Sequence, residues 1–155
     1  MVIHKTSSFT AAELSGFRAA AEDERIDRLD AVSVSDDTSH RLFRYGAYPP
    51  LRGTFVALDS REHLLFTRGS VEFYATYPGL YVPQPLLFRC EDVEQGPRQI
   101  ARELLGLSKL NWNRTQFDGS VPITVVAARK VGEILKYADV HGGGRPIAAR
   151  YSHYM

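Results

Sequence analysis

The residues best suited to chemistry lie in the segment 107–122, where basic and amide side chains precede the start of a predicted helix. Lys109 and Arg114 supply positive charge. Ser120 and Pro122 are typical of a helix N-terminus, whose free N–H groups and dipole favour an anion. The segment therefore predicts a place suited to a phosphate backbone, with an ordinary solvated loop before an ordinary helix as the alternative.

Other arrangements of reactive side chains are weaker. The five histidines lack the spacing of a metal-binding motif. Asp59 and His63 flank a predicted hairpin turn, which favours solvated surface over catalysis. Cys90 is followed by Glu91 and Asp92, and nearby carboxylates raise a thiol pKa. These patterns do not favour a metal hydrolase or an enzyme with a nucleophilic cysteine.

The bulk composition predicts one soluble domain. The chain has 155 residues, 19 basic and 18 acidic side chains, and a net charge of +1. With so small a net charge, a nucleic-acid site must come from local sorting of charges. No apolar run approaches the roughly 18–20 residues of a membrane helix, and the N-terminus does not resemble a secretory signal. We expect a cytoplasmic protein that does not enter a membrane.

The periodicity predicts alternating strands and helices. Strands are expected over 1–4, 26–35, 54–58, 63–67 and 86–89, with 54–67 forming a hairpin. A capping box at Thr10 and Glu13 begins a helix that ends near residue 24. A second helix starts at Pro97, and a third runs from about Pro122 to Tyr137. Its expected inward residues are Ile123, Ala127, Val131, Ile134 and Leu135. This pattern indicates an α/β layer fold.

Five pieces of the chain, in order, resemble one known family. They are RLFRYGAYPPLRGTF (41–55), FTRGSVEFYATYPGLYVPQPLLFR (66–89), LGLSKLNWNRTQFDGSVPIT (105–124), AARKVGEILKY (127–137) and the terminal YSHYM. Together they resemble the C-terminal part of the PIWI domain of a long prokaryotic Argonaute. The resemblance implies a ribonuclease-H-like fold with a mixed sheet flanked by helices. Residues 1–155 would be a partial PIWI domain.

The resemblance also implies what this segment does not contain. The upstream half of the PIWI domain and the MID, PAZ and N domains would lie outside it. Two of the family's four catalytic acids belong to that upstream half. The sheet would then keep one unpaired edge, which favours association with another chain. A second chain supplying the missing MID and PIWI half, or self-association, is therefore an expected partnership.

The same resemblance predicts that the chain is not an enzyme. Catalytic Argonautes use carboxylates to hold two divalent cations. The place of the family's third acid corresponds to Lys5, and the place of the fourth ligand corresponds to Arg129. Two cations would repel Mg²⁺, as in the inactive branch of long prokaryotic Argonautes, which bind guide and target without cutting. No catalytic cofactor is expected.

By resemblance, the segment 107–120 faces the 5′ portion of a guide strand. The candidates for phosphate contact are Lys109, Asn111, Arg114, Thr115, Ser120, Arg52, Lys130 and Lys136. Structural pairing is the alternative for Arg52, and a solvated helix face is the alternative for Lys130 and Lys136. Trp112 and Phe117 are better suited to a core. The terminal carboxylate of Met155 would help to hold a structural Mg²⁺ at the guide 5′-phosphate.

Three functional hypotheses follow. In the first, the chain binds an RNA or DNA guide, or the guide–target duplex, through its backbone and does not cut. In the second, it is a remnant or accessory interaction protein that self-associates without binding nucleic acid. In the third, a partner supplies the missing acids of a nuclease, which Lys5 and Arg129 argue against. Residue types do not distinguish an RNA guide from a DNA guide.

Overall fold

The computed structural model describes residues 1–37, 39–46, 48–71, 82–110 and 119–136. Within these ranges the elements are β1 (Val2–Lys5), α1 (Ala11–Asp23), β2 (Asp30–Asp36), β3 (Phe55–Ala57), β4 (Glu62–Leu65), β5 (Leu86–Asp92), α2 (Pro97–Leu107) and α3 (Ile123–Leu135). Each corresponds to an element predicted from the sequence. The expected strand 26–35 begins later, at Asp30, and the strand from Leu86 continues to Asp92.

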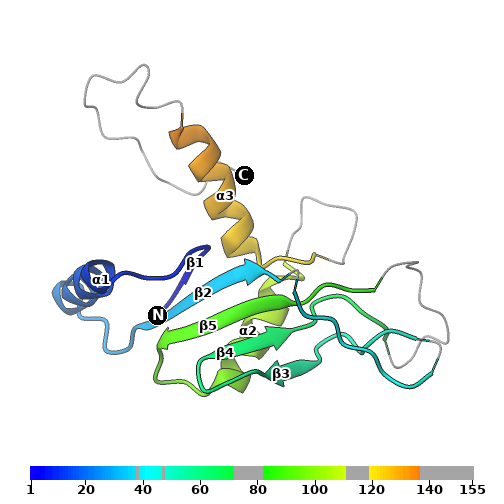
Figure 1. Cartoon of the computed structure of the whole chain (residues 1–155). Helices are drawn as coiled ribbons and strands as arrows, with labels where there is room; N and C mark the ends of the chain where they lie inside the picture. The colour runs from blue at the N-terminus through cyan, green and yellow to red at the C-terminus, as the bar shows by residue number, and fades with distance from the viewer. Residues whose placement is uncertain (38, 47, 72–81, 111–118, 137–155) are drawn as a thin grey trace.

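The strands form one mixed sheet in the order β1-β2-β5-β4-β3 (Figure 1). β1 and β2 are parallel and are joined through α1, whereas the other neighbours are antiparallel. The predicted α/β class, with a mixed sheet flanked by helices, is confirmed. β1 and β3 are the two edges of this sheet, and no other strand in the described ranges pairs with their outer sides.

The core lies on the sheet face that α2 covers. Side chains alternate along a strand, so residues paired across strands share a face. Val34 pairs with Phe88, and Leu65 pairs with Leu86. These side chains pack with Ile100 of α2 in a buried apolar cluster. Figure 1 shows α2 behind the sheet, so the face toward the viewer is the opposite one.

The inward face predicted for α3 is correct only in part: Ile123, Ala127 and Val131 are half-buried, Ile134 is exposed, and the side chain of Leu135 lies outside the described residues. Val125 is its residue in the core, whereas Ile134 is 46% exposed. The reason is visible in Figure 1, where α3 starts near the ends of β1 and β2 and then rises away from the sheet. Thr124, in its first turn, bonds the Nδ1 of His4 on β1 at 2.8 Å. Among the described residues, no helix has the length and apolarity that crossing a membrane requires.

Candidate nucleic-acid interface

The segments before and after the β3–β4 hairpin are joined by backbone hydrogen bonds. We call these segments the arginine lobe, which comprises residues 39–46, 48–54 and 66–70. Gly53 N donates to Phe66 O at 2.7 Å, and Phe66 N donates to Thr54 O at 2.9 Å. Farther out, Arg52 N donates to Ser70 O, and Ser70 N donates to Pro50 O. This ladder gives the exposed tip of the lobe a fixed base.

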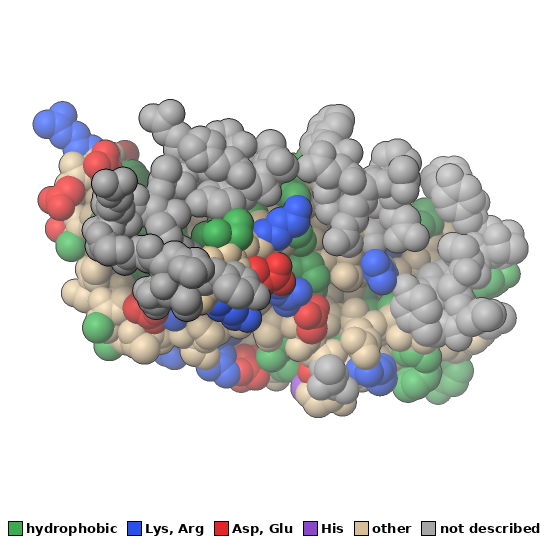
Figure 2. Space-filling model, turned by 90° about the horizontal axis from the view of Figure 1, so that it is seen from above, with side chains coloured by type: hydrophobic (Ala, Val, Ile, Leu, Met, Phe, Trp, Pro, Cys, Tyr) green, Lys and Arg blue, Asp and Glu red, His purple; other side chains and the backbone are tan. Residues whose placement is uncertain are grey.

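The arginine lobe has no acidic residue. No Asp or Glu occurs between Asp37 and Asp59, a stretch that contains Arg41, Arg44 and Arg52. The partner segment 66–70 adds Arg68 and no acid. In Figure 2, basic and acidic side chains mix over the middle of the molecule. Toward the right-hand end, where the lobe lies, basic and apolar side chains are visible without acidic ones. The lobe therefore concentrates positive charge on a nearly neutral chain.

Aromatic rings alternate with these arginines at the tip of the arginine lobe. Phe43 is 73% exposed and Tyr45 is fully exposed. Arg44 Nε donates to the carbonyl of Tyr48 at 3.3 Å, which holds the turn between them. Exposed rings beside arginines are the surface on which single-stranded bases stack while the backbone meets positive charge. In the sequence, residues 41–48 contributed only to the family resemblance and were not predicted as a binding site.

A buried carboxylate fixes the start of the arginine lobe. Asp37 accepts hydrogen bonds from Ser39 N and Oγ and from His40 N and Nδ1, at 2.6–3.0 Å. Burial alone would raise the pKa of Asp37, but the hydrogen bonds from Ser39 and His40 outweigh it and lower that pKa. The carboxylate thus stays ionised, and its negative charge is satisfied by hydrogen bonds within the protein.

Two of the predicted phosphate-binding residues lie close to the arginine lobe. Thr67 Oγ1 of the lobe donates to the carbonyl of Ser120 at 2.6 Å. Gly119 packs so tightly on Ser108 that an added Cβ would lie 2.2 Å from the Ser108 carbonyl oxygen. Lys109, which is exposed, follows directly. Arg52 belongs to the lobe itself, so Arg52, Lys109 and Ser120 converge on one region.

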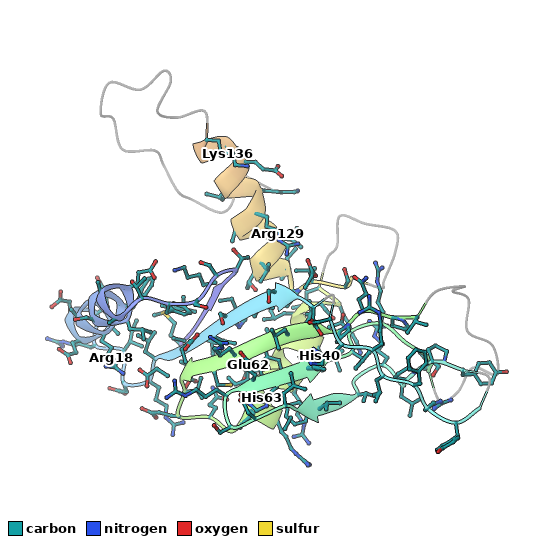
Figure 3. The ribbon with its side chains drawn as sticks, viewed as in Figure 1. Arg18, His40, Glu62, His63, Arg129 and Lys136 are labelled. Carbon is teal, nitrogen blue, oxygen red and sulfur yellow. The ribbon has the colours of Figure 1, made fainter. Side chains whose placement is uncertain are left out.

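The other predicted residues do not join that region. Lys130 is exposed on α3, and Lys136 lies at the far end of this helix, away from the sheet (Figure 3). Arg129 donates to Asp36 at 3.0 Å and so ties α3 to the end of β2. Asn111, Arg114, Thr115 and Met155 lie outside the described residues, as do Trp112 and Phe117.

Lys5 has a structural partner of its own. Its ammonium bonds both carboxylate oxygens of Glu13 at 2.6 Å and the carbonyl of Ser8 at 3.0 Å. With the capping hydrogen bonds from Thr10, this contact lowers the pKa of Glu13 to about 2. Lys5 follows His4, which faces α3, so strand alternation turns Lys5 to the other side. Lys5 and Arg129 are thus paired with different carboxylates. Within the described part of the chain, no three His, Cys, Asp or Glu residues gather as a metal site.

Several arginines away from the arginine lobe form ion pairs with acids. Arg18 on α1 donates to Asp92 at the end of β5 at 3.0 Å. Arg28 donates to Glu94 at 3.0 Å, and Arg89 pairs with Glu62 on the exposed sheet face. The pKa of Cys90 is raised to about 11, first by burial and then by Asp30 and Glu91, so its thiol is not activated.

Comparison with known proteins identifies the fold. No protein-family model and no curated protein sequence matches the chain. Among solved structures, Clostridium butyricum Argonaute bound to a guide DNA and a 19-mer target DNA matches with a TM-score of 0.67 and 18% identity. That match covers 88% of this chain and 17% of the other. Aa-Ago with externally bound siRNA matches with a TM-score of 0.68 and 20% identity, over 94% and 18%.

A structure of Aquifex aeolicus Argonaute matches with a TM-score of 0.67 and 20% identity, over 94% of this chain and 19% of that one. The chain therefore has the fold of one segment of Argonaute proteins and spans less than a fifth of their length.

Proposed function

We propose that this chain is the C-terminal part of an Argonaute-like PIWI domain, of ribonuclease-H-like fold, that holds a guide strand or guide–target duplex by its phosphate backbone. The observation that carries the proposal is the arginine lobe, where four arginines and exposed rings lie in segments that contain no Asp or Glu. The shared fold supports it, because two of the similar structures are described as bound to guide and target DNA or to siRNA. Lys109 and Ser120 extend the same interface.

We further propose that the chain does not cut nucleic acid. The basis is the residue types at the places matched to catalytic acids, Lys5 and Arg129. Each cation joins two elements through a carboxylate, Glu13 and Asp36 respectively. Lys5 and Arg129 would thus stabilise the fold, as expected of a domain that binds nucleic acid without cutting it. A structural Mg²⁺ at the guide 5′-phosphate, held in part by the carboxylate of Met155, belongs to the same proposal.

The test is binding of a 5′-phosphorylated single strand to the 155-residue chain, measured by fluorescence anisotropy over a range of salt. We expect affinity to fall steeply with salt, with a log–log slope of about −0.7 for each phosphate contact. The double variant R41E/R44E should lose at least about tenfold in affinity and show a shallower slope. No binding at low salt would rule out this function for the isolated chain.

A matched control separates local from global charge. R18E/R28E changes the net charge by the same amount, at arginines that lie outside the arginine lobe and already meet acids. We expect this variant to bind nearly as well as the wild type. Equal losses in the two double variants would show that the lobe is not the interface.

Two further comparisons test whether the chain recognises the 5′ end of the strand and which type of guide it prefers. A preference for 5′-phosphate over 5′-hydroxyl that requires Mg²⁺ would support the Met155 carboxylate site. Binding without an end preference would leave only a backbone interface. RNA and DNA strands of the same sequence, compared side by side, decide the guide type.

The second candidate function is self-association as an accessory interaction protein. It is favoured by the outer edge of β1, which pairs with no other strand among the described residues, and by the exposure of Ile134 on α3. Its signature is an oligomer that is insensitive to salt and retains no nucleic acid after purification. A salt-sensitive complex with a strand would instead support the first function.

A further inference from the structure

A cavity of about 300 Å³ lies between α2 and the β3–β4 hairpin. Its apolar lining comes from Phe55, Leu65, Ala101 and Leu105, and its polar lining comes from Arg98 and Arg102. Gly53 completes the wall. None of the lining residues is acidic. This volume is at the lower end of the range for small-molecule sites.

The two arginines of this cavity are a like-charged pair one helical turn apart. Arg98 and Arg102 are both exposed on α2. Neither makes an ion pair or side-chain hydrogen bond with a residue in the described ranges, in contrast to Arg18, Arg28, Arg89 and Arg129. Like charges at this spacing destabilise a helix. A bound anion would remove that repulsion and would meet two guanidinium groups at once.

The floor of the cavity offers an aromatic surface. Phe55 packs against Phe88 and His63, with ring centroids 6.2 and 5.4 Å away, so its position is fixed from the core side. Gly53 has a φ of 86°, and a Cβ there would lie 3.2 Å from the Cδ2 of Leu105. A glycine at this position leaves room for the Leu105 side chain where the chain enters β3. The cavity thus combines a fixed apolar floor with a cationic rim.

From this combination we propose that the cavity binds a small aromatic anion of nucleoside monophosphate size. The phosphate meets the guanidinium groups of Arg98 and Arg102, and the base lies against Phe55 and Leu105. A phosphate suits two guanidinium forks because it presents several oxygens to bidentate donors. The nucleotide can come from solution or from a nucleic-acid strand. This site does not rest on the arginine lobe, whose arginines are different residues.

The first measurement is a titration of the 155-residue chain with AMP, followed by two-dimensional amide NMR. We expect shifts at Gly53, Phe55, Ala101 and Leu105. Adenosine and inorganic phosphate, each carrying half of the recognised chemistry, should bind at least about tenfold more weakly than AMP. Shifts that map to other residues, or equal affinity for AMP and inorganic phosphate, would overturn the proposal.

Variants then separate this site from the arginine lobe. R98Q/R102Q keeps good helix formers and should weaken AMP binding by about tenfold or more, whereas R18Q/R28Q, which removes two arginines elsewhere, should leave it unchanged. R41E/R44E should weaken strand binding and leave AMP binding intact. If AMP binding survives in R98Q/R102Q, or is lost in R41E/R44E, the cavity is not a nucleotide site.

A short oligonucleotide that ends in the same nucleotide distinguishes the source of the ligand. If it competes with AMP for the shifts at Ala101 and Leu105, the site accepts a nucleotide within a strand. If AMP binds and the oligonucleotide does not compete, the site takes free mononucleotides. Either result supports an aromatic-anion site.

Discussion

At the scale of single residues, His63 shows how a local interpretation was wrong. Its position beside a hairpin turn indicated solvated surface, but the ring is 2% exposed and both nitrogens lack a hydrogen-bond partner. The ring packs against Phe55 and Phe88, with ring centroids 5.4 and 5.2 Å away. Cross-strand pairing with Phe88 places it on the core face of β4. Burial accordingly lowers the pKa of His63. Asp59, by contrast, accepts backbone hydrogen bonds in the exposed turn, as expected.

Replacing this histidine should stabilise the fold. His63→Leu removes two buried nitrogens without partners, a gain of about 1–3 kcal/mol in the free energy of unfolding. Because the folded-state pKa lies below the ordinary value of 6.5, the unfolded state takes up the proton first as the pH falls. The wild type therefore loses stability below about pH 6.5, and the advantage of the variant should grow toward lower pH. Urea unfolding at pH 8 and pH 5 measures both effects, and an advantage independent of pH would contradict the assignment.

At the scale of elements, the start of α1 combines a capping box with an ion pair. Glu13 N donates to Thr10 Oγ1 at 3.2 Å, and Thr10 N donates to the Glu13 carboxylate at 2.8 Å. The sequence predicted this box from residue types and spacing alone. The sequence did not predict the third participant, Lys5 of β1, because β1 and α1 meet only in the folded chain.

Glu13 makes the stability of α1 depend on pH. The folded state lowers the pKa of Glu13 from 4.5 to about 2, so its contribution is fully present above about pH 4.5 and is lost as the pH falls toward 2. Glu13→Gln should therefore be less stable than the wild type at pH 7, and the difference should shrink between pH 4.5 and pH 2. Denaturant unfolding across this range is the measurement. A difference that persists at pH 2 would mean that the ionised carboxylate is not responsible.

The base of the arginine lobe depends on one glycine. Gly69 has a φ of 153°, and an added Cβ would lie 2.3 Å from the carbonyl oxygen of Pro50. Gly69→Ala should cost about 1–3 kcal/mol of stability and reduce strand binding, because the two halves of the lobe can no longer close. Calorimetry and anisotropy on the same samples test both effects.

The matched control for that substitution is Gly132→Ala. Gly132 lies within α3 with nothing near the position of an added Cβ. Alanine there should stabilise the helix by about 0.5–1 kcal/mol and leave strand binding unchanged. If both variants behave alike, the close approach of Gly69 to Pro50 is not what holds the two halves of the arginine lobe together.

At the scale of the whole molecule, charge is sorted by region. The net charge of +1 gives no long-range attraction for a polyanion. Arg18 and Arg28 pair with Asp92 and Glu94, while the sequence segments of the arginine lobe and the lining of the α2 cavity contain no Asp or Glu. Any binding of anions should therefore be local and should respond to substitutions at these two places.

The open edge of the sheet predicts concentration-dependent association. β1 pairs with β2 on one side, and within the described ranges nothing pairs with its other side. Such an edge offers backbone donors and acceptors to another chain. Sedimentation velocity should show self-association that increases with protein concentration and persists at high salt. A monomer at every concentration would show that the edge is not used between copies of this chain.

The sequence by itself determined the elements and the local chemistry. Periodicity located the helices and strands, and the Thr10–Glu13 box marked the start of α1. Its residue types also supplied the resemblance behind the proposal of a non-cutting binder. The absence of acids between Asp37 and Asp59 was equally visible and was not used. These features depend on neighbours within a few residues, which is why they can be read along the chain.

Only the tertiary structure decided which distant residues meet. Strand register buried His63, and backbone hydrogen bonds beyond the strand ends joined Arg52 to Ser70. The bond from Thr67 to Ser120 brought the predicted helix start to the arginine lobe, while the departure of α3 from the sheet exposed Ile134. The cavity flanked by Arg98 and Arg102 exists because α2 packs across the hairpin. Contacts between residues far apart in sequence depend on strand register and on the direction in which helices pack. The hydrophobic periodicity of a single segment does not specify either of these.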